Sequence, residues 1–205
     1  MKNFYSNFIV FEGLDGAGTT TQIKRLAKKL EDYDKKVFLT HEPTDNPIGR
    51  LVRDVLQHKV KTTSGALALL YASDRDDHLK NPEYGIERKL EEGSIVLSDR
   101  YFYSSIAYQG VDLDLDFVKS INPFPHAEYL IFIDTSVESC MRRIEKRGED
   151  KELFDHAEFL KKVRSNYLSQ LEYLPKETKL LVLDGELSID ELENRIWDFI
   201  KKEIL

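Results

Sequence analysis

Short apolar runs alternate with longer amphipathic segments along this chain. Runs typical of buried strands lie at 8–11, 36–40, 94–98, 129–133 and 179–183. Between them, apolar residues recur at helical spacing and predict helices at 19–30, 48–56, 64–79, 86–92, 102–109, 137–147, 157–174 and 189–204. Strands that alternate with helices build a parallel sheet covered by helices on both faces. With no internal repeat or linker, residues 1–205 are expected to form one α/β domain with five strands.

Glycines gather where the first expected strand meets the first expected helix. In such a turn, backbone N–H groups can converge on phosphate oxygens, and the helix dipole favours negative charge there. The pattern predicts the phosphate cradle of a P-loop, although a plain glycine-rich turn would show the same glycines. The predicted cradle consists of Gly13, Leu14, Asp15, Gly16, Ala17, Gly18, Thr19 and Thr20.

The cradle departs from the P-loop pattern at one position. The pattern G-x-x-x-x-G-K-[ST] requires a lysine after its second glycine, and this chain has Thr19 there. Thr20 still occupies the position of the hydroxyl that binds magnesium. Because the strand before the loop and the helix after it are both present, we interpret the segment as a P-loop.

Charged residues follow other predicted strands at the edge of the sheet where ligands bind. In an open parallel sheet, ligands lie beyond the carboxyl ends of the strands. Asp99 and Arg100 come directly after the third strand, the sequence 41–43 follows the second, and Asp134 follows the fourth. An arginine at that edge can hold a phosphate with two hydrogen bonds. The alternative is a structural ion pair between Asp99 and Arg100.

Composition and charge exclude several classes of function. The 205 residues are 41% hydrophobic and 33% charged, which describes a globular chain, and no apolar run reaches the length of a membrane span. The net charge of −7 argues against a general nucleic-acid surface. The start of the sequence has no apolar signal segment, so we expect a cytoplasmic protein. Cys140 is the single cysteine, and the five histidines have no metal-ligand spacing and are expected mostly at the surface.

Several segments resemble one known family, the thymidylate kinases. They are DGAGTTTQ (15–22), HEP (41–43), LLYASDR (69–75), SDRYFYSSIAYQG (98–110) and RIEKRG (143–148). The segment KELFDHAEFLKKVRSNYL (151–168) is similar to the archaeal branch of that family. The resemblance implies a P-loop fold with a lid and the transfer of the γ-phosphoryl group of ATP to dTMP. It also implies magnesium as cofactor and a homodimer as the assembly.

Site residues follow from the same resemblance, position by position. Those expected at the phosphates and the metal are the loop Gly13 to Thr20 around ATP, Asp15, Arg53 and Arg100 at the acceptor phosphate, and Thr20 with Asp99 at magnesium. Those expected at the nucleoside are Tyr71 stacked on thymine, Arg75 at a thymine carbonyl, Ser104 and Ser105 near the base edge, and Tyr108 with Gln109 beside the deoxyribose.

The resemblance further implies a lid at about 142–155 that brings arginines to the phosphates. Arg143 and Arg147 lie four residues apart on one predicted helical face, where a solvated basic face is the alternative. Asp150 and Lys151 stand where the family often has an Asp-Arg pair. The missing P-loop lysine leaves two other functions open. One is a nucleotide-binding module without catalysis, and the other is a kinase for another deoxynucleotide.

Overall fold

The computed structural model describes residues 4–146 and 153–204. Its sheet has five strands, β1 (Phe4–Gly13), β2 (Val37–His41), β3 (Ile95–Asp99), β4 (His126–Asp134) and β5 (Lys179–Asp184). They lie in the order β2-β3-β1-β4-β5, and every neighbouring pair is parallel. The predicted five-stranded parallel sheet is confirmed.

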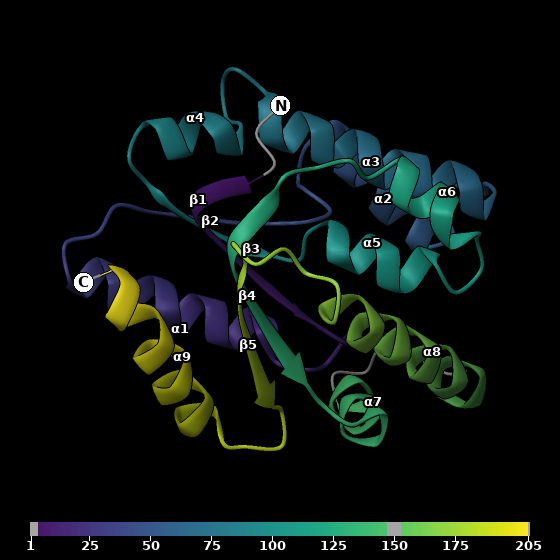
Figure 1. Ribbon diagram of the computed structural model, residues 1–205. Coiled ribbons are helices and arrows are strands. Elements are labelled where there is room, and N and C mark those ends of the chain that lie inside the picture. The colour runs from purple at the N-terminus through teal and green to yellow at the C-terminus, as the bar shows by residue number, and fades with distance from the viewer. Residues whose placement is uncertain (1–3, 147–152, 205) are drawn as a thin grey trace.

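Helices cover both faces of this sheet (Figure 1). One face packs against α1 (Thr19–Asp32) and α9 (Ile189–Ile204). The buried apolar residues of these helices form a core with the side chains that β1 and β4 direct toward this face. The helices of the other face are α3 (Ser64–Lys80), α4 (Ile86–Glu91), α5 (Phe102–Gln109), α6 (Leu115–Ser120), α7 (Val137–Glu145) and α8 (Leu153–Leu171), with α2 (Pro47–Leu56) packed on α3.

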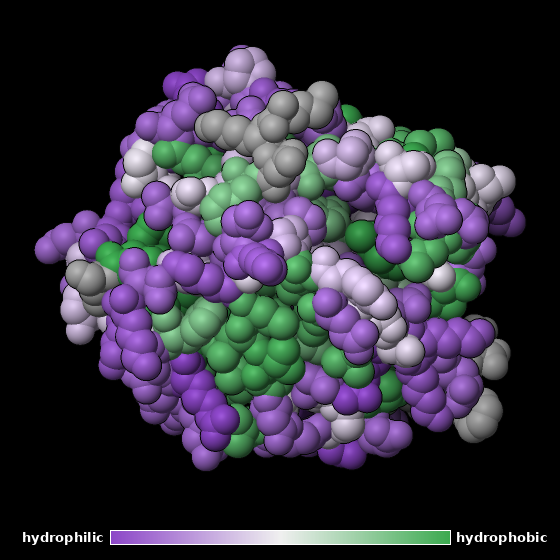
Figure 2. All heavy atoms as spheres, in the orientation of Figure 1, coloured by the Kyte–Doolittle hydropathy of each residue, from purple (hydrophilic) through white to green (hydrophobic). Residues whose placement is uncertain are grey.

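The two cores leave a mainly polar exterior. Figure 2 shows hydrophilic residues over most of one face, with apolar residues exposed in limited areas. Cys140 on α7 is fully buried, as expected for a small residue on a helix. Among the helices in the described ranges, none combines the length and the apolar character that crossing a bilayer requires.

Several element boundaries differ from the predicted ones. Strand β1 is ten residues long because its first residues pair with β4. A register shift in this pairing, between Tyr5 and Ile9, interrupts the alternation of buried and exposed positions that would mark a strand in the sequence. Helix α6 was not predicted, because its one buried residue, Val118, shows no helical spacing, whereas α4 of the same length has Ile86 and Leu90 four residues apart on the core. Helix α8 starts at Leu153 and ends at Leu171, earlier than predicted at both ends.

The parallel arrangement brings the ends of four strands together. Phe11 of β1 lies beside Asp99 of β3, and Asp99 lies beside His41 of β2. On the other side of β1, Gly13 is paired with Ile133 of β4. The segments that follow these strands therefore meet at one edge of the sheet, where the sequence predicted the ligands.

Candidate active site

The loop between β1 and α1 has the backbone of a phosphate cradle. Gly16 and Gly18 have φ angles of 86° and 101°, which side chains disfavour. A Cβ on Gly16 would also lie 2.8 Å from the carbonyl oxygen of Cys140. The carbonyl of Gly18 accepts the N–H groups of Thr21 and Gln22, and these are the first hydrogen bonds of α1. The N–H groups of the two residues before them, Thr19 and Thr20, have no carbonyl partner within the helix. These amides and the helix dipole can hold an anion.

The two threonines after Gly18 have different environments. Thr19 is buried, with 7% of its surface exposed, so this position of the cradle carries a short neutral side chain. Thr20 is exposed, and its hydroxyl donates to Asp99 Oδ2 at 2.6 Å. The pair predicted as magnesium ligands thus lies together, although Thr20 comes from the first turn of α1 and Asp99 from the end of β3.

Arg100 lies at the centre of the predicted phosphate residues. Its Nη2 donates to Asp15 Oδ1 at 2.7 Å, and its guanidinium lies 5.2 Å from the centre of the Tyr108 ring. The Tyr108 hydroxyl accepts the backbone N–H of Asp15 at 3.1 Å. Arg100 therefore pairs with the P-loop aspartate. The ion pairs in the described part of the chain do not include Asp99 with Arg100, so the alternative of a structural pair between these neighbours is wrong.

A buried carboxylate lies behind Arg100. Glu12, the residue before Gly13, is 1% exposed and accepts hydrogen bonds from Tyr101, Ser104 and Tyr167. Burial raises the pKa of Glu12 to about 7, although Arg100 and the hydrogen-bond donors lower it. Ser104, predicted near the base edge, thus points into the network around Arg100.

Arg75 is held in a second buried network. Its Nε donates to Glu42 Oε2 at 2.7 Å, its Nη2 to Ser105 Oγ at 3.0 Å, and its Nη1 to Asn122. His78 Nδ1 lies 3.1 Å from the other oxygen of Glu42. Burial opposes ionisation of Glu42, but Arg75 and His78 together hold its pKa below the usual range. His78 is buried in this network, whereas His41 and His58 are exposed, as expected for most of the histidines.

The other predicted acceptor residues are Tyr71, Gln109 and Arg53. Burial raises the pKa of Tyr71 to about 12, while the nearby charges of Arg100 and Asp15 act on it in opposite directions. Gln109 has a buried side-chain oxygen without a hydrogen-bond partner in the described residues. Arg53, a residue of α2, donates to the carbonyl of Pro43 at 2.8 Å and to Asp45 at 2.8 Å, so its guanidinium lies against the loop after β2.

The lid arginines can be placed only in part. Arg143 Nη1 donates to the carbonyls of Gly16 and Ala17, each at 3.2 Å, and its Nη2 donates to the carbonyl of Gly185 at 2.9 Å. This guanidinium therefore binds the P-loop through the loop's carbonyl groups. Arg147, Asp150 and Lys151 lie outside the described residues.

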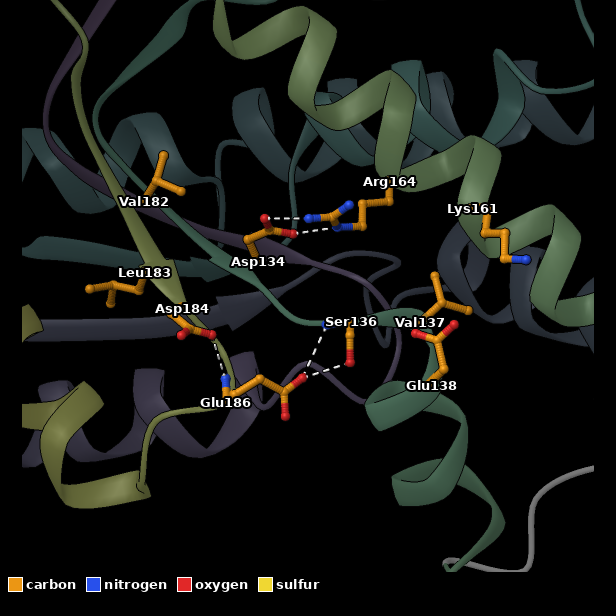
Figure 3. Close-up of a pocket in the computed structure, with 10 residues that line it drawn as sticks. All are labelled: Asp134, Ser136, Val137, Glu138, Lys161, Arg164, Val182, Leu183, Asp184 and Glu186. Atoms are coloured by element: carbon orange, nitrogen blue, oxygen red, sulfur yellow. Dashed lines mark hydrogen bonds and ion pairs between the residues drawn. The ribbon is translucent and has the colours of Figure 1, made fainter.

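A separate pocket opens beyond the ends of β4 and β5, between α7 and α8. Figure 3 shows Asp134 and Arg164 facing each other there, with two hydrogen bonds of 2.6 and 2.7 Å. Glu186 binds the hydroxyl of Ser136 at 2.7 Å on the same wall. None of the predicted P-loop or acceptor residues lines this pocket. Asp134, noted in the sequence as a strand end, is thus neutralised by Arg164.

Four residues of these networks were given no role from the sequence, although two of them lie at the predicted strand ends. Glu12 is an acidic residue at the end of an apolar strand, and this signal could have marked it. Glu42 likewise follows the second strand. Asn122 and Tyr167 carry no such signal, because their partners are distant in the sequence and only the fold brings them together.

Comparison with known proteins identifies the family. The family model described as thymidylate kinase matches residues 11–196. A protein of Pyrococcus horikoshii named "probable thymidylate kinase" is 40% identical over 205 residues, covering 97% of each chain. A protein of Methanocaldococcus jannaschii with the same name is 39% identical over 199 residues, covering 95% of each chain. A Treponema pallidum protein, also named as a thymidylate kinase, is 39% identical over 98% of this chain and 97% of its own. The chain belongs to the thymidylate kinase family.

Proposed function

We propose that this member of the thymidylate kinase family transfers the γ-phosphoryl group of ATP to dTMP, giving dTDP for dTTP synthesis. The observation that carries the proposal is the position of Arg100, which reaches the P-loop through Asp15 and packs on the Tyr108 ring. A guanidinium between a phosphate cradle and an acceptor pocket can bind an acceptor phosphate. It can also neutralise charge that develops during transfer.

The acceptor base would be recognised by the second network. In the described part of the chain, three of the five N–H donors of Arg75 are bonded to protein groups, which fixes the guanidinium plane. A further donor would serve a thymine carbonyl, although only 1% of the Arg75 surface is exposed in this structure. Tyr71, near Arg100 and Arg75, offers a ring face for stacking. Tyr108 and Gln109 would form the wall beside the deoxyribose.

Magnesium fits the oxygen donors at the mouth of the cradle. The Thr20 hydroxyl and the Asp99 carboxylate, 2.6 Å apart, are the kind of ligands that this ion accepts together with phosphate oxygens and water. When bound, magnesium would neutralise negative charge on the phosphates of ATP. The protein's own contribution is to hold Asp99 at the end of β3, beside Phe11 of β1.

Thr19 leaves the cradle without its usual lysine, and we propose that the enzyme is slow or is assisted by lid arginines. Losing one cation that stabilises the transferring group typically costs about 10²–10³-fold in rate. Arg143 is the described lid arginine nearest the P-loop, bonded to its carbonyls. Arg147 remains a candidate for the same role.

We further propose a homodimer, with α2 and α3 as the contact surface. These two helices pack on each other and expose Leu51, Leu56 and Leu69 at 39%, 48% and 49%. Light scattering on the purified chain would test this, and a monomer at micromolar concentration would exclude it. A cytoplasmic location follows from the proposed substrates, which are cytoplasmic metabolites.

A coupled assay decides between the proposed reaction and its alternatives. The acceptors are dTMP, dUMP, dCMP, dGMP and thymidine, each with ATP and magnesium. We expect the highest kcat/KM with dTMP. A purine or cytosine monophosphate as best acceptor would indicate a different nucleotide kinase. If no acceptor is phosphorylated, while ATP and dTMP still bind in calorimetry, the chain is a nucleotide-binding module.

A further inference from the structure

The Arg100 guanidinium is supported by a buried relay of two hydroxyls and one carboxylate. Glu12 Oε1 accepts the backbone N–H groups of Tyr101 at 2.9 Å and of Ser104 at 3.3 Å. Glu12 Oε2 faces the hydroxyls of Ser104 at 2.6 Å and of Tyr167 at 2.8 Å. Arg100 Nη1 reaches the same two hydroxyls at 2.9 and 3.2 Å. Two parallel paths, each through one hydroxyl, thus connect the guanidinium to the carboxylate.

The donor inventory fixes the direction of every hydrogen bond in this relay. Arginine can only donate, an ionised carboxylate can only accept, and a hydroxyl has a single proton. Ser104 and Tyr167 therefore accept from Arg100 and give their protons to Glu12. Their hydroxyl oxygens lie 2.8 Å apart, but neither proton is available for that contact once both point at Glu12.

We propose that Glu12 is a positioning residue, whose carboxylate turns the Ser104 and Tyr167 hydroxyls so that both accept from Arg100 and hold it toward the acceptor. The function of that orientation rests on the proposed dTMP kinase activity, whereas the ordering of the guanidinium does not. Arg100 needs such support because its backbone has a φ of 77°, so the residue starts from a strained conformation. Asp15 fixes the other end of the guanidinium, at Nη2.

Glu12→Gln reverses the relay with almost no change in side-chain volume. The backbone N–H groups of Tyr101 and Ser104 require an oxygen at the Oε1 position, so the new amide nitrogen must lie where Oε2 lies now. That nitrogen donates to the Ser104 and Tyr167 hydroxyls, so neither hydroxyl proton has the carboxylate as its acceptor any longer. The 2.8 Å contact between the two hydroxyls can take up only one of these protons. The two acceptors at Nη1 of Arg100 are then no longer both held in a fixed orientation, while the packing around the side chain is preserved.

The kinetic test is a double-mutant cycle at pH 8.5, above the pKa of Glu12 of about 7. Glu12→Gln is expected to lower kcat for dTMP phosphorylation by about 10- to 100-fold, the range for hydrogen bonds to a charged group, with KM for ATP changed less than about twofold. In the Arg100→Ala background, the same substitution is expected to change kcat less than about twofold. Glu87→Gln is the matched control, since Glu87 also accepts from a tyrosine hydroxyl, that of Tyr5, but on α4.

Nitrogen NMR of the arginine side chains supplies a readout that needs no activity. The Arg100 signal, identified by its loss in Arg100→Ala, should report slow guanidinium rotation in the native chain and fast rotation in Glu12→Gln. Equal losses of kcat in both backgrounds would mean a structural role, and a native kcat with a rigid Arg100 would exclude the relay. If Glu12→Gln does not fold, Tyr167→Phe decides, because it removes one path and should cost about 3- to 10-fold in kcat. If the native chain phosphorylates no dTMP, the proposed function fails, and the NMR comparison alone decides on positioning.

Discussion

Replacing Arg100 by alanine separates the catalytic contribution of this residue from its structural one. The native guanidinium is bonded to Asp15, Ser104 and Tyr167 and lies at the edge of the P-loop. If it stabilises charge during transfer, its loss should lower kcat by about 10²–10³-fold, or about 3–4 kcal/mol of transition-state stabilisation. A coupled assay at saturating ATP and dTMP measures this loss directly.

The same substitution leaves Glu12 buried without its nearest cation. Leaving a buried charge without the opposite charge that compensates it typically costs about 3–5 kcal/mol, but here Glu12 can take up a proton instead. Its pKa is already about 7, and Arg100 is one of the groups that lower it. In the variant the folded-state pKa rises further, so the folded state binds a proton that the unfolded chain releases. We therefore expect a small loss of stability at pH 6, growing by up to about 1.4 kcal/mol per pH unit above pH 7.

Arg164→Ala provides the matched control for these measurements. Arg164 forms two hydrogen bonds to Asp134 at the end of β4, outside the P-loop cluster, and its side chain is 39% exposed. Its removal should change kcat less than about threefold, since exposed ion pairs contribute little. A turnover of Arg100→Ala within about threefold of the native value, at unchanged Tm, would refute the assignment of Arg100 to the reaction.

Three further predictions concern charge in the phosphate cradle and in the two buried networks. Thr19→Lys should raise kcat by about 10-fold or more. Arg143→Ala should then lower kcat less in the Thr19→Lys variant than in the native chain. An unchanged steady-state kcat in Thr19→Lys contradicts this prediction. Glu42→Gln leaves Arg75 buried without its carboxylate, so thermal unfolding should show a loss of about 3–5 kcal/mol together with a higher KM for dTMP. Because Glu12 has a raised pKa, its stabilising contribution is complete below about pH 4.5 and is lost as the pH rises through about 7. Denaturation from pH 5 to 8 should reveal a loss of about 3 kcal/mol that is absent from Glu12→Gln, whereas parallel profiles would exclude a titrating Glu12.

The sheet could be predicted from the sequence because its strands are buried on both faces. Such strands appear as uninterrupted apolar runs, and the alternation with helices then leaves little choice of topology. The cradle could be predicted because its signal is local, a run of glycines between a strand and a helix. Helix α6 gave no such signal, because it is held by the Asp114 cap and by a single buried residue, Val118.

The directions of the site side chains could not be predicted. Ser104 and Ser105 are adjacent in the sequence, and both were expected at the base edge. On α5 they point about 100° apart. Ser104 therefore binds Glu12 and Arg100, and Ser105 binds Arg75. Such a difference depends on how α5 is rotated against β1 and α8, which no local pattern records.

Two energetically unfavourable features, a strained backbone and a buried carboxylate, lie where we propose that the reaction takes place. Of the non-glycine residues with positive φ in the described chain, three are Asn7, Asp34 and His58, types that tolerate this conformation, and the fourth is Arg100. For a long side chain this backbone costs on the order of 1–2 kcal/mol. Glu12 follows Phe11, the residue of the neighbouring strand β1 that pairs with Asp99 of β3, and it adds the cost of a buried carboxylate. Neither feature improves packing, yet each compensates the other, since the carboxylate orients the hydroxyls that hold the strained arginine. A fold selected for stability alone would have no reason to retain this pair, whereas a site that must present a rigid cation to a phosphate requires it.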